Sequence, residues 1–357
     1  MTLRSLHFGS AMIDIITLVA NDDIERATFQ NEGTSFLMLE TGRKLPAESI
    51  TTHVGGGACN TAVSLARQGW DAAILAKVGD DLNAGAVRAH LTTNDVGDRL
   101  ITSAQATGTA VMIASHDRNA SIFVHRGANE HLAPDDLPGF DGADLVYVAP
   151  LSSGSADCFP LIVAGAKKAG AMVAVNPGIR QLTNRLSTFL GAMGDLDLIS
   201  INRAEADALI PAVLRQIDPG PAAPIPEDAP ALMRRGLRAA GLEMGLIPFL
   251  QAVRDLGPKW VSLTDGTDGA YLAGPDGVIW HPSLPAEVAG TAGAGDAFCS
   301  TLTGALASGT LPARAMFRAA LNSASVVSHI DTTTGLQSAD ALVSQTADAA
   351  PQAIVLA

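Results

Sequence analysis

Cysteine is scarce in this sequence, and long apolar runs are missing. Cys59, Cys158 and Cys299 are far apart among the 357 residues, and their odd number provides neither a disulfide framework nor a CxxC metal pair. No run of about 18 apolar residues occurs, and the first residues lack a basic segment followed by an apolar one. We therefore expect a cytoplasmic protein without a membrane-spanning helix or a secretory signal.

Basic residues are the scarcer charge, with 23 Lys and Arg against 36 Asp and Glu, so the formal net charge is -13. A nucleic-acid groove or an anionic membrane surface needs clustered cations, so neither is an expected partner. Aromatic residues make up 4% of the chain and hydrophobic residues 47%, which is typical of a soluble α/β protein. The length fits one large α/β domain, which we expect to span residues 1–357.

Short apolar runs alternate with stretches of helical periodicity. The expected strands are residues 6–8, 72–78, 143–149, 171–175, 197–201 and 260–264. The expected helices are residues 57–68, 84–93, 155–169, 293–308 and 312–329. This alternation predicts a mostly parallel sheet covered by helices on both faces, a three-layer α/β domain.

Three segments interrupt the alternation. Residues 15–53 and 104–127 contain short runs of alternating polarity, which predict antiparallel strands of a small sheet that covers a site as a lid. An exposed edge or an oligomer interface is the alternative reading, and both are compatible with a lid. Residues 211–230 contain six prolines and predict a loop or semi-rigid linker, followed by a helix at about 231–255.

The stretch GTAGAGDAF, residues 290–298, places a bare backbone in front of one carboxylate, Asp296. A glycine-rich turn that opens a helix exposes unpaired N–H groups and the positive end of the helix dipole, which together form an anion hole. A kinase needs this combination, because the carboxylate accepts a hydroxyl proton while the N–H groups neutralise a migrating phosphoryl group. A helix start capped by Asp is an equally good reading of the motif alone. No GxxxxGK[ST] sequence occurs, which excludes a Walker-type loop.

A second glycine cluster lies in HVGGGACNTAVSLARQG, residues 53–69, with Asn60 in the first turn of the expected helix. Asn offers both a donor and an acceptor to a hydroxylated ligand. A dinucleotide fingerprint needs GxGxxG, and position 60 is not glycine. A ligand site and a plain strand-to-helix turn both remain open.

Three further polar groups follow expected strands. Asn202 and Glu205 in NRAE suit Mg²⁺ held by oxygen atoms and water, although a helix N-cap with a capping-box Glu explains the same residues. TDGTDGA, residues 264–270, either cradles nucleotide phosphates or forms a tight turn between two strands. Asp14 in GSAMID is placed to hydrogen-bond a polyol.

The order and spacing of these pieces resemble the ribokinase-like, or PfkB, carbohydrate kinase family. The matching pieces are GSAMIDII near the start, GGGACN at 55–60, AKVGDDLNAG at 76–85, HRGAN at 125–129, NRAE at 202–205, TDGTDGA at 264–270 and TAGAGDAF at 291–298. They span nearly the whole chain. The resemblance implies a ribokinase-like fold and ATP-dependent, Mg²⁺-assisted phosphorylation of a hydroxyl of a sugar or nucleoside.

The resemblance also implies roles for single residues. Asp296 matches the general base, and the positions that match the anion hole are Gly293, Ala294 and Gly295. The positions that match acceptor-binding residues are Asp14, Gly56, Gly57 and Asn60. The positions that match the motif organising Mg²⁺ through water are Asn202 and Glu205. The positions that match nucleotide-binding residues are Thr264, Gly266 and Gly269 at the phosphates and Asn322 beside the adenine.

Two features depart from the family pattern. Gly290 stands where the family commonly has an Asp that belongs to a monovalent-cation site, so we expect a weak dependence on potassium. The proline-rich segment enlarges a connection that is usually brief in the family.

The acceptor and the assembly are less closely defined. Arg43, Lys44 and Arg126 in the lid segments are candidates for a substrate phosphate or carboxylate, but exposed basic residues are more often solvated, and we expect an unphosphorylated sugar. A purine nucleoside kinase and a catalytically weak sugar-binding relative are the alternatives, and the glycine spacing disfavours an oxidoreductase. We expect a homodimer formed through the lid.

Overall fold

A computed structural model describes residues 2–20, 25–29, 34–42, 44–114, 120–216, 225–239, 241–347 and 353–356. Its main feature is a sheet of ten strands in the order β20-β19-β18-β17-β14-β13-β12-β1-β6-β8. The strands are β1 (Arg4–Phe8), β6 (Asp71–Leu75), β8 (Gly97–Asp98), β12 (Leu145–Val148), β13 (Met172–Val175), β14 (Leu198–Asn202), β17 (Trp260–Thr264), β18 (Ala270–Gly274), β19 (Gly277–His281) and β20 (Ile354–Val355). Pairing is parallel from β8 to β17 and antiparallel from β17 to β20, as the expected fold class requires.

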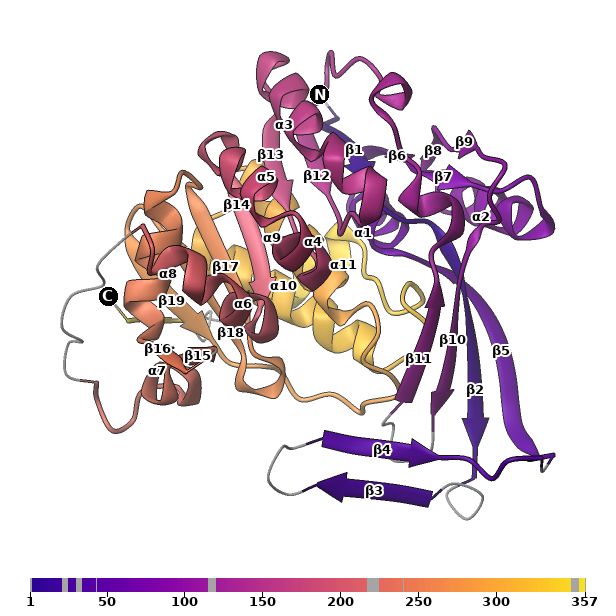
Figure 1. Ribbon diagram of the computed structural model, residues 1–357. Helices are drawn as coiled ribbons and strands as arrows, with labels where there is room; N and C mark the ends of the chain where they lie inside the picture. The colour runs from indigo at the N-terminus through magenta and orange to yellow at the C-terminus, as the bar shows by residue number, and fades with distance from the viewer. Residues whose placement is uncertain are drawn as a thin grey trace.

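Helices cover both faces of this sheet (Figure 1). One face packs against α3 (Phe159–Lys168), α4 (Ile179–Asn184), α5 (Leu186–Gly191), α6 (Arg203–Val213) and α8 (Leu246–Asp255). The other face packs against α1 (Gly57–Arg67), α2 (Leu82–Thr93), α9 (Ala294–Ala307) and α10 (Pro312–Val327), and α11 (Ala339–Ala347) lies against α10. Side chains of β12 alternate between the two cores, with Val146 and Val148 in one and Leu145 and Tyr147 in the other. The three-layer prediction is confirmed.

A second, four-stranded sheet projects from the α/β body (Figure 1). Its order is β11-β10-β2-β5, from β11 (Ala120–His125), β10 (Gly108–Ala114), β2 (Met12–Val19) and β5 (Ala47–Gly55). We call it the lid sheet. The expectation of antiparallel pairing is wrong for β2 and β10, which run parallel because they come from two insertions that leave the core in the same direction.

Smaller strand pairs complete the chain. The hairpin β3 (Glu25–Phe29) with β4 (Thr34–Met38) lies at the far end of the lid sheet, and β7 (Lys77–Val78) pairs with β9 (Ile101–Thr102). The expected strand 72–78 is therefore two strands, β6 and β7. Residues 116–119, whose sequence HDRN is typical of a turn between two strands, lie outside the described residues, as does the candidate Arg43. Within the described ranges, no helix is long and apolar enough to cross a membrane.

The region after α6 differs from the prediction. Pro211 lies inside α6, and the expected loop therefore begins later than residue 211. The expected helix at 231–255 is wrong. The chain forms α7 (Ala231–Arg235), a hairpin of β15 (Leu237–Ala239) and β16 (Leu242–Met244), and then α8. Gly236 at φ 67 and Gly241 at φ 78 adopt left-handed backbone conformations, which end the helix and turn the hairpin.

Candidate active site

The glycine-rich stretch at 290–298 forms the start of α9. Gly293, the N-cap, has φ 79, and a Cβ at this position would lie 2.7 Å from the Cβ of Thr332. Glycine is therefore required here both by the backbone conformation and by the close approach of Thr332. The first-turn N–H groups of α9 have no helical partners by geometry, so the helix start is able to bind an anion.

Asp296 lies in this first turn and is held by a chain of two hydrogen bonds. Asn60 Nδ2 donates to Asp296 Oδ2 at 2.8 Å, and Thr332 Oγ1 donates to Asn60 Oδ1 at 2.8 Å. Because Thr332 occupies the amide oxygen, the amide nitrogen of Asn60 faces the carboxylate. Sequence reasoning missed Thr332; its only signal was the polar run DTTTG at 331–335.

Asp14 on β2 joins the same cluster. A Cβ on Gly55 would lie 2.1 Å from Asp14 Oδ2 and 3.5 Å from Thr332 Oγ1, so the bare backbone of Gly55 makes room for the carboxylate. Burial and, to a smaller extent, the charge of Asp296 together raise the pKa of Asp14 to about 6. Burial also raises the pKa of Asp296 to about 6, although the hydrogen bond from Asn60 opposes this.

Gly56 and Gly57 have packing reasons for being glycine. Gly56 has φ 100, and a Cβ there would lie 2.5 Å from the carbonyl oxygen of Ser10. A Cβ on Gly57 would lie 3.0 Å from the Cβ of Ala149 and 3.7 Å from Asp296 Oδ1. The segment therefore forms the expected strand-to-helix turn and lies beside Asp296.

Asn202 and Glu205 form the capping box of α6. Asn202 N donates to Glu205 Oε2 at 2.9 Å, and Glu205 N donates to Asn202 Oδ1 at 3.0 Å. The pKa of Glu205 is raised to about 7, chiefly by burial; the hydrogen bonds with Asn202 oppose this rise and the charge of Asp296 supports it. Among the described residues, no group of three His, Cys, Asp or Glu side chains is arranged to bind a metal directly. The carboxylates of Glu205 and Asp296 are close enough for their charges to interact, and such a pair suits a hard divalent cation bound through water.

A cavity of about 590 Å³ lies beside the start of α9. Residues 264–270, which we call the glycine loop, contribute Thr264, Gly266 and Gly269 to its wall, and Ala294 and Gly295 of α9 face it as well. The volume is that of a small-molecule pocket. The structure thus brings the glycine loop and the start of α9 to one cavity.

Asn322 does not line this cavity. The face of α10 on the cavity carries Ala320, Ser323, Ala324 and Val327, at helical spacing. Asn322 is fully buried on the opposite side, where it donates to Thr301 Oγ1 at 2.7 Å and accepts from Gln337 N at 2.8 Å. Through these two hydrogen bonds, Asn322 connects α10 to α9 and to the segment before α11.

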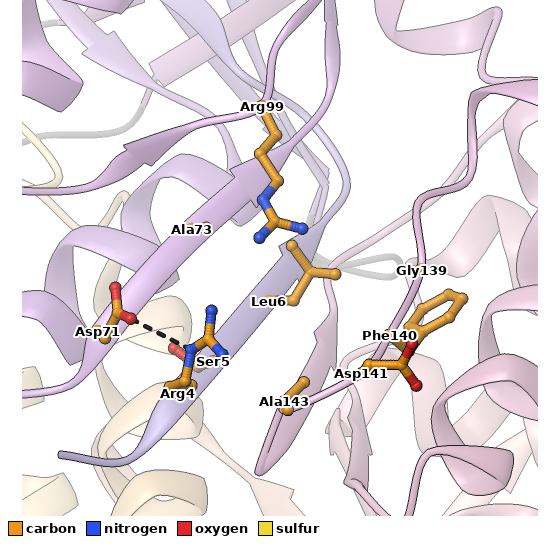
Figure 2. Close-up of a pocket in the computed structure, with 11 residues that line it drawn as sticks. Arg4, Ser5, Leu6, Asp71, Ala73, Arg99, Gly139, Phe140, Asp141 and Ala143 are labelled. Atoms are coloured by element: carbon orange, nitrogen blue, oxygen red, sulfur yellow. Dashed lines mark ion pairs between the residues drawn. The ribbon is translucent and has the colours of Figure 1, made fainter. Parts of the chain in front are cut away.

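A second hollow of about 40 Å³ lies beside the first residues of β1 and β6 (Figure 2). Arg4 pairs there with Asp71 at 3.3 Å, and the guanidinium of Arg99 points into the same hollow (Figure 2). The volume holds about one water molecule. This hollow is too small for a sugar or a nucleotide.

Comparison with known proteins identifies the class to which this fold and site belong. The sequence model of the pfkB family of carbohydrate kinases matches residues 6–339. The chain is 27% identical to the ATP-dependent ribose-1-phosphate kinase of Halopiger xanaduensis over 69% of its own length and 71% of that protein. It is 27% identical to a fructokinase of Klebsiella pneumoniae over 72% and 78% of the two chains. The ribokinase of Cryptococcus neoformans, solved in complex with ADP, superposes with a TM-score of 0.70 at 20% identity over 97% and 99% of the chains.

The chain therefore belongs to the pfkB family of carbohydrate kinases and has the ribokinase-like fold. It is an ATP-dependent kinase of a sugar or nucleoside.

Proposed function

We propose that Asp296 is the general base that activates a sugar hydroxyl. With a pKa of about 6, its carboxylate is mostly ionised at neutral pH and is able to take the hydroxyl proton. The oxygen then bonds to the γ-phosphorus of ATP, the bond from that phosphorus to the bridging oxygen breaks, and ADP leaves. One observation carries this proposal: Asp296 accepts a hydrogen bond from Asn60 and acts on Asp14, and it lies in the same first turn of α9 whose residues line the cavity.

The backbone N–H groups of Gly293, Ala294 and Gly295 are proposed to stabilise the transferring phosphoryl group. They lie in the first turn of α9, where the helix dipole favours negative charge. Thr264, Gly266 and Gly269 are proposed to contact the phosphates of the nucleotide, because they share the cavity wall with Ala294 and Gly295. The face of α10 that includes Ser323, rather than Asn322, is proposed to lie beside the adenine, because it lines the cavity.

Asn202 and Glu205 are proposed to hold Mg²⁺ through water. When bound, the ion supplies positive charge that neutralises the phosphates. Glu205 is suited to this role because burial and Asp296 raise its pKa to about 7, so added positive charge would stabilise its ionised form.

Asp14, Gly56, Gly57 and Asn60 are proposed to bind the acceptor, which we expect to be an unphosphorylated sugar. The carboxylate of Asp14 accepts hydrogen bonds from hydroxyls, and the glycines let a sugar approach the main chain.

A second candidate acceptor is a sugar that already carries a phosphate or carboxylate. Arg126, at the end of β11, lies 3.8 Å from the carboxylate of Glu130, and its buried Nε has no hydrogen-bond partner among the described residues. The charge of Arg180 on α4 acts on it as well. Arg126 thus has one carboxylate and one further guanidinium in its surroundings, which leaves positive charge near the end of β11 and favours an anionic substituent.

The experiment is a coupled assay of ADP release with ribose, fructose, a deoxy-keto acid, a phosphorylated ketose and a purine nucleoside. We expect one class to stimulate ADP release well above the rate without acceptor. The Asp296→Asn variant should reduce this rate by about a hundred- to ten-thousand-fold while it still folds. A near wild-type rate for Asp296→Asn would show that the assigned base is wrong.

A further inference from the structure

The glycine loop is fastened from the side that faces away from the cavity. Gly266 with φ 56 and Gly269 with φ 94 shape the turn, and Asp265 N donates to Gly269 O at 2.9 Å. Thr264, Gly266, Thr267 and Gly269 face the cavity. The side chain of Asp265 is turned to α6 and α7 instead, and 3% of it is exposed. Asp265 is therefore one point where the loop meets the rest of the molecule, beside the hydrogen bonds from Trp280 Nε1 to Asp268 O and from Ser283 Oγ to Thr267 O.

Two arginines from different elements meet this buried carboxylate. Arg203, the first residue of α6, lies 3.3 Å from Asp265 Oδ1. Arg235, the last residue of α7, pairs with Asp265 Oδ2 and also lies 3.4 Å from Asp268 Oδ2. Burial raises the pKa of Asp265, and both arginines oppose this rise. The ionised carboxylate in the loop thus depends on cations that α6 and α7 supply.

Arg235 comes from the enlarged connection between α6 and α8, which departs from the family pattern. This connection packs firmly where it is described: Leu232 of α7 and Leu237 of β15 are buried in the main core. Gly236 N donates to Leu232 O at 2.9 Å and closes α7 directly after Arg235. Arg235 is therefore presented to the loop by a fixed element rather than by a solvated chain.

We infer that Arg235 is a positioning residue for ATP, and that the segment carrying it serves to hold the glycine loop in its nucleotide-binding conformation through Asp265. The inference rests on the proposed function, because it takes the glycine loop to be the site of the nucleotide phosphates. A loop with two left-handed glycines has many alternative conformations, so ordering it on binding costs free energy. A loop that Arg235 has already ordered binds phosphate without this cost.

The test is the Arg235→Gln variant, with ADP affinity measured by calorimetry and with steady-state kinetics. Without Arg235, Asp265 retains Arg203, whose side chain is 52% exposed, and the Asp265 carboxylate is paired at one oxygen only. We expect ADP to bind about five- to twentyfold more weakly and the KM for ATP to rise by a similar factor. The acceptor KM and kcat should stay within about twofold of wild type, since Asp296 and Asp14 are untouched.

Two further variants separate positioning from general stability. Arg235→Lys keeps a charge but not the planar fork, so its ADP affinity should lie between those of wild type and Arg235→Gln. It also carries the test if Arg235→Gln does not fold. In the wild-type background, Asp265→Asn should weaken ADP binding. In the Arg235→Gln background, the same substitution should weaken ADP binding much less, because the contact between the two residues is already lost.

The matched control is Arg238→Gln, in the hairpin that follows α7. Arg238 pairs with Glu243 at 3.1 Å, and both side chains are exposed. We expect this variant to bind ADP as wild type does. Three outcomes would overturn this inference but not the proposed function. They are an ADP affinity of Arg235→Gln equal to that of wild type, a loss of ADP affinity in Arg238→Gln as large as in Arg235→Gln, and an equal rise in the KM of ATP and of the acceptor in Arg235→Gln. If wild type itself does not bind ADP, the proposed function fails and the inference fails with it.

Discussion

Asp296 owes its position to a residue that lies far from it in the chain. Thr332 holds the amide oxygen of Asn60, and the amide nitrogen of Asn60 in turn holds Asp296. A hydrogen bond of this kind adds little net stability, but a flipped amide would place an oxygen against the carboxylate and repel it. At the residue scale, the orientation of Asn60 is thus as important as its identity.

We predict that Thr332→Val lowers the kcat/KM for the acceptor by about three- to thirtyfold, because the amide of Asn60 is then free to rotate. The KM for ATP should not change. Thr333→Val is the matched control, since the Thr333 hydroxyl contacts Asp331 rather than Asn60. Steady-state kinetics with both substrates varied decide the matter, and equal behaviour of the two variants would contradict the role of Thr332.

Gly290 leads to a second prediction at this scale. A Cβ at this position would lie 3.1 Å from the carbonyl oxygen of His329 and 3.2 Å from that of Ile330, so carbonyl oxygens are present but the carboxylate is not. Affinity for a hard cation depends on ligand charge as well as on oxygen count. We expect potassium to change turnover by less than about twofold relative to sodium or a bulky organic cation at fixed ionic strength. A several-fold rise specific to low millimolar potassium would refute this prediction.

At the element scale, the lid sheet exposes apolar side chains on the face opposite Asp14. Strand register places Asp14 level with Val124, so Phe123, one residue earlier on β11, points to the other face. Ile50 on β5 lies on that same face, and Phe123 and Ile50 are 62% and 65% exposed. Large exposed side chains on a sheet with open edges are typical of a surface that another chain covers.

We therefore predict a homodimer in which lid sheets of two copies meet. The double variant Ile50→Glu with Phe123→Glu should be a monomer by light scattering at micromolar concentration, because the charges oppose burial. Leu311→Glu, at an exposed position just before α10, is the control and should remain a dimer. A wild-type protein that is monomeric under these conditions would contradict the prediction.

At the scale of the whole molecule, the site costs stability at neutral pH. The pKa values of Asp14, Asp296 and Glu205 are raised to about 6, 6 and 7. Between about pH 4 and 7 the folded state therefore binds more protons than the unfolded state. The sign of the linkage then requires that stability falls as pH rises through this window and stays low above it.

We predict that Asp296→Asn is more stable than wild type at pH 8, by on the order of 2 kcal/mol, and that this difference shrinks to roughly a third of that value at pH 4.5. Removing the charge also relieves Asp14, whose pKa is raised by Asp296. Thermal unfolding without nucleotide at the two pH values measures the effect. The exposed Asp141→Asn variant serves as control, and a stabilisation of Asp296→Asn that is equal at both pH values would disprove the linkage.

Most strands and helices of the α/β body were predictable because their patterns are local. Apolar runs at 143–149 and 171–175 became β12 and β13, and the glycine-rich stretch at 290–298 became the start of α9. The prediction of one helix over 231–255 is wrong because it gave too little weight to Gly236 and Gly241. Both glycines adopt left-handed conformations, which end α7 and turn the following hairpin. The helical periodicity of α10 already indicates that the neighbours Asn322 and Ser323 point to different sides of the helix. Matching a sequence motif does not test which side of a helix a residue lies on.

The order of residues was enough to establish the alternating α/β architecture, the family, and a carboxylate placed behind a glycine-rich helix start. Each of these depends on neighbours within a few residues, where propensity, glycine conformation and helix geometry act directly. Tertiary structure alone established that β2 pairs with β10 in parallel, that Thr332 reaches Asn60, and that Arg235 reaches Asp265. Such contacts arise when packed layers bring distant segments together, and no local pattern in the chain specifies which polar groups then meet.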